Sequence, residues 1–180
     1  SVPADLFDPE QKKAFAAAVR EYEDLQVATA DRPGAHLNLG LLHASRKRLD
    51  LAEQSYQSAI RMDGNFMPAR VNLANLFNQT GRNAEAERLF RETIARFPEG
   101  GEFRYSLGLL LAEEGQLEES AQALAKAVEL MPARPRVRYN YSLALQQLGQ
   151  QAEAEAAMLA AYAMTPEDPS ILEALIAFYS

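Results

Sequence analysis

The sequence predicts an all-α solenoid of antiparallel helix pairs, with about ten helices. Three classes of residue recur with one shared period along a chain of 180 residues. Asparagine or serine, glycine and proline each keep this spacing: Asn38, Asn72, Ser106 and Asn140; Gly81, Gly115 and Gly149; Pro98, Pro132 and Pro166. A period of about 34 residues that three residue classes share indicates a repeated structural unit rather than a single globule.

Each unit contains two helices separated by a short break. In the first unit, apolar residues recur at helical spacing over residues 39–42 and again over residues 51–60. The breaks of the later units fall at the periodic glycines, because glycine readily takes the left-handed conformation that ends a helix. Lys47 holds this position in the first unit, so we expect it to cost some stability. A proline, or Gly64 in the first unit, ends each second helix.

The two helices of a pair are predicted to pack closely. One position of the first helix carries a small residue in every unit: Gly40, Ala74, Gly108 and Ser142. The second helix carries a bulky residue that can fill the space left beside it: Tyr56, Phe90, Leu124 and Met158. Bulk at the small position would separate the two backbones.

These residues carry a resemblance to a known family. A unit of this length in which His36-Leu37-Asn38-Leu39-Gly40 leads to Ala52, Tyr56 and Ala59 resembles a tetratricopeptide repeat. The resemblance implies a right-handed superhelical solenoid with four complete repeats, at residues 33–66, 67–100, 101–134 and 135–168. Residues 1–32 are then an N-terminal capping helix or degraded half-repeat, and residues 169–180 a C-terminal capping helix or truncated fifth repeat.

The two ends carry matching helix starts. Asp8-Pro9-Glu10-Gln11 predicts a capped helix to about Thr29, and its apolar stripe resembles the second helix of a preceding repeat. Asp168-Pro169 starts a last helix that is apolar nearly all round, although terminal repeats normally carry a polar outer face. We therefore expect either that the native chain continues or that this end packs on another molecule, with self-association through Leu175, Phe178 and Tyr179.

Composition removes several classes of function. The chain has no cysteine, which excludes thiolate nucleophiles and disulfides, and it has only two histidines, His36 and His43. Zinc clusters built from cysteine and histidine are therefore excluded as well. No Ser-His-Asp order and no glycine-rich phosphate loop occurs, and we expect no enzyme, no cofactor and no metal. A net charge of −7 disfavours nucleic acid as a partner. No apolar run reaches the roughly 20 residues of a membrane helix, so we expect a soluble protein without direct membrane insertion. Its localisation is unknown from the sequence, which leaves both the bacterial cytoplasm and the periplasm open.

The resemblance also implies a binding surface. In the family, ligand contacts come from the first helix of each repeat, which lines the concave side. The corresponding positions here form the predicted groove: Leu37, Asn38, Leu41, Val71, Asn72, Asn75, Asn78, Tyr105, Ser106, Leu109, Tyr139, Asn140, Leu143 and Gln146. The periodic asparagines can pair with the backbone of an extended peptide, or they can hold neighbouring helices together. The sequence leaves both readings open.

Charge at these positions narrows the class of ligand. Family members that bind the terminal carboxylate of chaperones are similar to one another in carrying lysine at certain groove positions. This chain has the uncharged residues Leu37, Val71, Tyr105 and Tyr139 there, so we expect an apolar or mixed ligand instead of a chaperone tail. A set of arginines recurs beside the groove positions: Arg70, Arg104, Arg136 and Arg138. Their stems can cover the core while their heads reach solvent, or they can form a basic stripe for an acidic segment.

The sequence thus predicts a non-catalytic protein–protein interaction module that binds a partner peptide or protein segment. One alternative is a self-assembling scaffold that docks through its terminal helices, which would make the chain a homo-oligomer. Another is a repeat segment of a larger bacterial multidomain protein. Residues 32–39 and 66–76 are similar to repeat tails attached to multihaem cytochromes, which would imply the periplasm.

Overall fold

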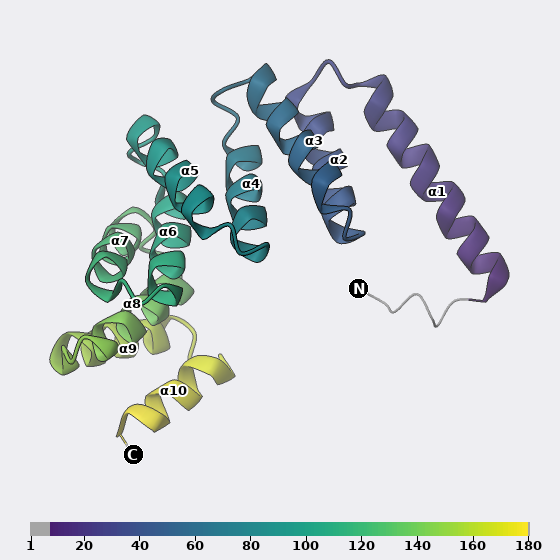
Figure 1. Ribbon diagram of the computed structural model, residues 1–180. Coiled ribbons are helices and arrows are strands. Elements are labelled where there is room, and N and C mark those ends of the chain that lie inside the picture. The colour runs from purple at the N-terminus through teal and green to yellow at the C-terminus, as the bar shows by residue number, and fades with distance from the viewer. Residues whose placement is uncertain (1–7, 180) are drawn as a thin grey trace. The chain divides into compact units, whose positions relative to one another are not determined.

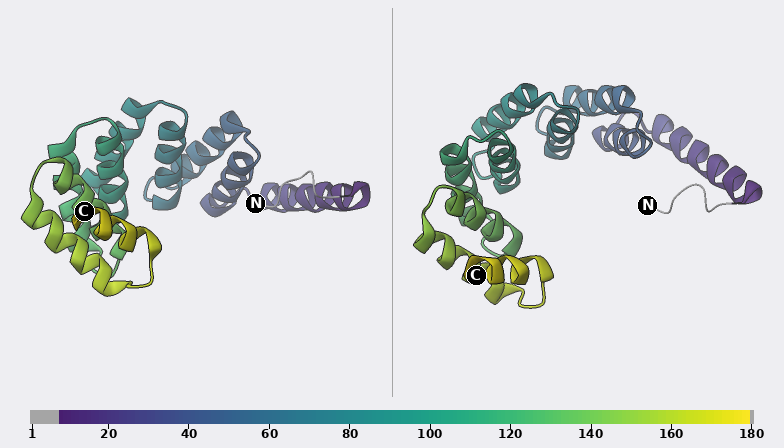
Figure 2. Two further views of the ribbon diagram at one scale, coloured as in Figure 1. Left: turned by 90° about the horizontal axis from the view of Figure 1, so that it is seen from below. Right: turned by 60° about the horizontal axis from the view of Figure 1, so that its bottom comes forward.

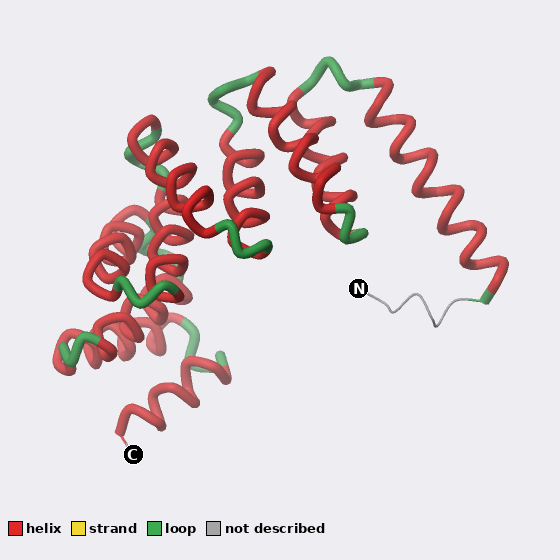
Figure 3. The backbone as a smooth tube through the Cα atoms, in the orientation of Figure 1, coloured by secondary structure: helices red, strands yellow, loops and turns green. Residues whose placement is uncertain are grey.

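The computed structural model describes residues 8–179, and in this range the chain forms ten α-helices and no strand (Figures 1 and 3). This confirms the predicted all-α fold class. The helices are α1 (Pro9–Ala28), α2 (Pro33–Ser45), α3 (Leu49–Met62), α4 (Met67–Gln79), α5 (Asn83–Arg96), α6 (Gly101–Glu113), α7 (Leu117–Leu130), α8 (Pro135–Gln147), α9 (Gln151–Met164) and α10 (Pro169–Tyr179). The chain divides into two compact units, residues 1–76 and residues 77–180.

The first helix starts as the sequence predicts. The Gln11 backbone N–H donates to Asp8 Oδ1 over 2.8 Å, and the Asp8 N–H donates to Gln11 Oε1 over 3.1 Å. This reciprocal pair is a capping box, with Pro9 at the first helical position. The helix ends at Ala28, one residue before the expected end.

In the first unit, α2 and α3 pack as a close pair. Gly40 lies directly beneath the Tyr56 ring, so that a Cβ at residue 40 would overlap the ring. Tyr56 is 2% exposed, and Ala52 and Ala59 on the same face of α3 are fully buried. Burial raises the pKa of the Tyr56 phenol. The predicted small-against-bulky arrangement is therefore present in this pair.

The second unit has two layers of helices. The first helices α6 and α8 and the terminal α10 form one layer, and the second helices α5, α7 and α9 form the other (Figure 2). The first-helix layer lies on the inner side of the bend of this unit. Between the layers, Leu124 is buried against Gly108, and Ser120 Oγ donates to the Gly108 carbonyl oxygen over 2.7 Å.

All four turns within the helix pairs have the predicted left-handed residue. Gly81, Gly115 and Gly149 have φ of 75°, 76° and 74°, and Lys47 has φ of 58°. The backbone N–H of the residue after each of these positions donates to the carbonyl oxygen five residues earlier. The Arg48 N–H, for example, donates to the His43 carbonyl oxygen over 2.9 Å. Lys47 is thus held by its turn in a conformation that costs a side-chain-bearing residue about 1 kcal/mol or more.

The last helix packs through only part of its apolar surface. Asp168 Oδ1 accepts from the Ser170 backbone N–H over 2.9 Å, so the predicted helix start is present. Ile171 is fully buried against α9, and Leu175 packs at the edge of the same cluster. The most exposed large side chains of α10 are Ile176 and Tyr179, each 59% exposed. No helix among residues 8–179 combines the length and the apolar character needed to cross a membrane.

Candidate protein-interaction surface

The fourteen predicted groove residues all keep part of their surface accessible. Twelve are half-buried, and Leu41 and Gln146 are exposed. By contrast, the adjacent small position of the first helix is buried in every repeat, at Gly40, Ala74, Gly108 and Ser142. The first helices therefore turn one face to the second helices and leave the face that carries the predicted residues available for contact.

Two predicted groove residues bond to each other in the second unit. Asn140 Nδ2 of α8 donates to Tyr105 Oη of α6 over 2.7 Å. The bond joins neighbouring first helices, and it fixes the orientation of both side chains at the surface. Asn140 keeps its carbonyl oxygen and Tyr105 keeps its hydroxyl proton for a further partner.

The other asparagines have different bonding partners. Asn38 Nδ2 donates to Gln26 Oε1 of α1 over 3.0 Å, and Asn72 Nδ2 donates to the Pro68 carbonyl of its own helix over 2.8 Å. Asn38 and Asn140 therefore do hold neighbouring helices together, which was one of the two readings. Gln26 is only 7% exposed, and the sequence did not identify it because it lies outside the four periodic repeats.

The periodic basic side chains bind the backbone of the turn that precedes their helix. Arg70 Nε donates to the Gly64 carbonyl over 3.0 Å, Arg104 Nη2 to Pro98 over 3.0 Å, and Arg138 Nη2 to Pro132 over 3.4 Å. His36 occupies the same position, with Nε2 at 3.1 Å from the Ala30 carbonyl oxygen. A carbonyl can only accept, so this contact requires the His36 tautomer with its proton on Nε2.

The contacts of His36, Arg70, Arg104 and Arg138 share one geometry. Each side chain reaches a carbonyl six residues upstream, in the loop that joins successive repeats. The guanidinium groups, and the His36 ring, are thus hydrogen-bonded to the backbone and do not only contact solvent. Arg136 differs, because it is exposed and lies 5.5 Å from the centre of the Tyr139 ring. Binding of an acidic segment by these arginines stays a prediction.

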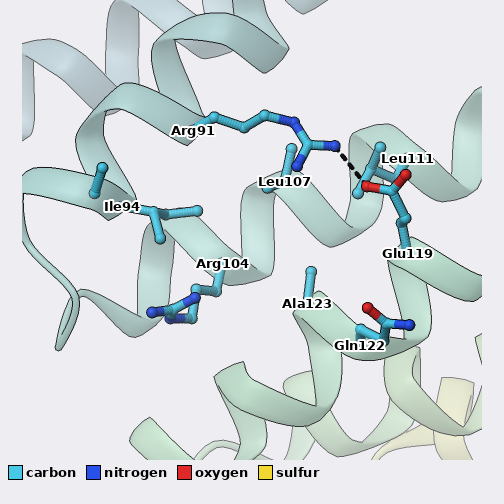
Figure 4. A pocket seen from close by; sticks show the side chains of 9 residues that line it. Arg91, Ile94, Arg104, Leu107, Leu111, Glu119, Gln122 and Ala123 are labelled. Carbon is cyan, nitrogen blue, oxygen red and sulfur yellow. Dashed lines mark hydrogen bonds and ion pairs between the residues drawn. The ribbon is translucent and has the colours of Figure 1, made fainter.

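A hollow of about 370 Å³ lies on the second-helix side of the second unit, between α5, α6 and α7 (Figure 4). Ile94, Leu107 and Ala123 form part of its lining. Arg91 Nη2 donates to Glu119 Oε2 over 2.6 Å across it, and this bond contributes most to the raised pKa of Arg91. No sequence signal indicated this hollow, because it depends on the distance between two second helices.

His43 sits in an environment that favours its neutral form. Burial is the largest cause of its lowered pKa, and the nearby Arg48 guanidinium acts in the same direction. His36 and His43 do not join a metal site, and residues 8–179 contain no cluster of three histidine, aspartate or glutamate side chains able to hold a metal ion.

The family and the fold can be compared with known proteins. The tetratricopeptide repeat family matches residues 12–65, 71–135 and 135–168. No curated protein matches the chain. Among solved structures, MamA from Desulfovibrio magneticus RS-1 is 19% identical, covers 81% of this chain and 82% of its own, and has a TM-score of 0.72.

Two further solved structures share the fold. YrrB, described as a tetratricopeptide-repeat protein with an unusual peptide-binding site, is 21% identical over 88% of this chain and 81% of its own, with a TM-score of 0.69. PilF of Pseudomonas aeruginosa is 24% identical over 81% of this chain and 67% of its own, with a TM-score of 0.73. The family matches span well over half of the chain, and they agree with its sequence period and its paired helices. The chain belongs to the tetratricopeptide repeat family.

Proposed function

We propose that the chain is a non-catalytic interaction module that binds an extended partner segment along the first helices of its second unit, α6 and α8. The observation that carries the proposal is the Asn140–Tyr105 hydrogen bond, which holds two polar side chains in fixed positions on that surface. Each group retains a hydrogen-bonding atom that can meet the backbone of a partner, whatever the partner's sequence.

The neighbouring side chains define the chemistry of the partner. Leu109 and Leu143 lie one turn after Ser106 and Asn140, and both are half-buried. They offer apolar contact, and no lysine stands at the positions where the family clamps a terminal carboxylate. The proposed ligand is therefore an apolar or mixed peptide segment. The peptide-binding site described for YrrB supports this use of the fold.

The test selects peptides from a displayed random library on the wild-type chain and measures their affinity for variants. Asn140→Ala with Leu109→Asp changes the proposed surface, and Leu159→Asp changes a 42% exposed leucine of the second helix α9 as the matched control. We expect the double variant to weaken binding about tenfold or more, as at interaction hot spots, with helical content unchanged. Equal affinity of both variants, or loss on Leu159→Asp alone, would refute the assignment.

A second candidate function is self-assembly through α10. The apolar residues Leu172, Ile176 and Tyr179 are 40%, 59% and 59% exposed, whereas Leu175 packs on α9 and Phe178 is half-buried. Ile176→Glu therefore tests this candidate better than a change at Phe178. If α10 mediates assembly, light scattering will show an oligomer for the wild type and a monomer for Ile176→Glu.

A further inference from the structure

The hollow between α5, α6 and α7 has an apolar floor (Figure 4). Leu107 is 5% exposed and Leu111 is 1% exposed there, and Ile94 and Ala123 are half-buried beside them. The volume of about 370 Å³ lies at the lower end of the range of known ligand pockets. The hollow is therefore large enough for one large apolar side chain with part of its backbone.

The next repeat differs at the corresponding position. Tyr141 stands one repeat period after Leu107, and it packs against the cluster of Ala121, Leu124 and Ala144. The hollow beside Tyr141, between α7 and α8, is smaller, with a volume of about 260 Å³, and its lining contains no arginine. The hollow at Leu107 thus differs from its neighbour both in size and in the charge that it presents.

The two ends of the hollow at Leu107 carry different charges. At one end, Arg91 donates to Glu87 through Nε and to Glu119 through Nη2, over 2.6 Å in each case. One arginine with two carboxylates leaves a net negative charge at this end. Arg104 lies at the other end (Figure 4). Within the part of the chain that the structure describes, no carboxylate forms an ion pair with Arg104.

Arg104 keeps hydrogen-bond donors for a ligand. Its Nε and Nη2 both donate to the Pro98 carbonyl oxygen, over 3.3 and 3.0 Å, and these two bonds hold the plane of the guanidinium. An arginine has five N–H groups, so three remain for other acceptors. A carboxylate is the favoured acceptor, because charge-assisted hydrogen bonds are about twice as strong as neutral ones.

We propose that this hollow binds a partner polypeptide segment in which a large apolar residue is followed directly by an acidic one. The apolar side chain lies over Leu107 and Leu111, and the carboxylate binds Arg104. The net negative charge around Arg91 repels the acidic residue, so the segment binds in one direction only. This site is on the second-helix side, and it is separate from the first-helix surface of the proposed function.

The exposed rim of the hollow favours a polypeptide over a free small molecule. Arg91, Ala95, Glu119 and Gln122 line the hollow and are all exposed. A small molecule bound there would keep much of its surface in water, whereas ligand pockets normally bury most of the ligand. A polypeptide segment gains further contacts along the exposed sides of α5 and α7.

Nuclear magnetic resonance titration of the isotope-labelled chain tests the proposal with two probe peptides. The probes are acetyl-Gly-Phe-Glu-Gly-amide and acetyl-Gly-Phe-Gln-Gly-amide. One buried apolar side chain and one charge-assisted bond correspond to a dissociation constant of about 1 mM, which this method can measure. We expect shifts of the backbone amides of Ala95, Leu107 and Ala123, and about threefold or more tighter binding of the glutamate probe.

Variants of the hollow separate its size from its charge. Leu107→Tyr introduces the residue that the next repeat carries at this position, and it should abolish the shifts with both probes. Ala123→Leu narrows the hollow from half-buried α7 surface and should do the same, which keeps the test valid if Leu107→Tyr does not fold. Arg104→Met should remove the preference for the glutamate probe. Arg88→Met is the matched control on an exposed arginine outside the hollow, and it should keep the preference.

Several results would overturn the proposal. They are the absence of shifts up to about 10 mM probe, equal affinity of the wild type for both probes, and unchanged binding in Ala123→Leu. Shifts confined to Tyr105 and Asn140 would place the probes on the first-helix surface and would overturn it too. The double variant Asn140→Ala with Leu109→Asp should bind both probes as the wild type does, so the two surfaces are tested separately.

Discussion

Gly108→Ala tests the close packing on which each repeat depends. A Cβ at residue 108 would lie 2.6 Å from Leu124 Cγ and 3.3 Å from the Ser120 carbonyl oxygen. The first distance is far inside van der Waals contact, so α6 and α7 must move apart and strain the Ser120–Gly108 hydrogen bond. Overpacking of this kind costs about 1–3 kcal/mol, and the better helix propensity of alanine returns up to about 1 kcal/mol. We expect a net loss of about 1–2 kcal/mol in the free energy of unfolding.

Urea denaturation followed by circular dichroism at the helix band measures this loss. Gly34→Ala is the matched control, since a Cβ there meets no atom within 4 Å. It should stabilise the chain by about 0.5 kcal/mol through propensity alone. If Gly108→Ala is neutral or stabilising, as Gly34→Ala is expected to be, the argument that glycine is required by close approach is refuted.

A double-mutant cycle assigns the effect to its proposed cause. Leu124→Ala alone should cost about 2–5 kcal/mol, because it leaves a cavity in the core. In the Gly108→Ala background it should cost at least about 1 kcal/mol less, since the added methyl group occupies part of that cavity and no longer meets Leu124. Strictly additive effects would show that the clash lies elsewhere.

Three further predictions concern separate features. Lys47→Gly should stabilise the chain by about 1 kcal/mol in urea denaturation because φ is 58° there, whereas Gly81→Lys should destabilise it by a similar amount; the opposite signs would contradict the strain argument. Because burial lowers the pKa of His43, its unfolded form gains a proton first as the pH falls below 6.5. The free energy of unfolding is therefore highest above pH 6.5 and falls as the pH drops from 6.5 toward the lowered pKa of folded His43. In His43→Asn this fall in stability should be smaller. Arg104→Met should lower stability by about 1 kcal/mol in thermal or urea unfolding through its lost carbonyl bonds, and equal effects of Arg104→Met and the exposed control Arg88→Met would count against that role.

The first-helix surface shows where sequence reasoning succeeds and where it stops. The period located every predicted groove residue on a first helix, because helical spacing fixes which residues share a face. It could not decide what Asn38, Asn72 and Asn140 bond to. Their partners are Gln26, the Pro68 carbonyl and Tyr105, and two of these three lie on other helices. Such pairings depend on the distances between elements, which a periodic pattern does not contain.

The periodic arginines also show what the sequence could not predict. The sequence placed Arg70, Arg104 and Arg138 at one position of successive repeats. It left open whether their guanidinium groups reach solvent or bind an acidic segment. In the structure each guanidinium reaches a carbonyl of the preceding loop. The loop between repeats brings that carbonyl, six residues upstream, within range of the guanidinium. The spacing of the arginines did not show whether their guanidinium groups would turn to it or to solvent.

By itself, the sequence determined the repeat period, the pairing of helices, the left-handed turns and the position of the small residues against the bulky ones. These features follow from backbone sterics and helical periodicity, which act over a few residues. Only the tertiary structure decided which faces stay exposed at the ends, as at Tyr22 and Ile176, and which side chains bond across helices. Exposure and long-range hydrogen bonds depend on how whole helices are positioned beside one another, and no local pattern specifies that placement.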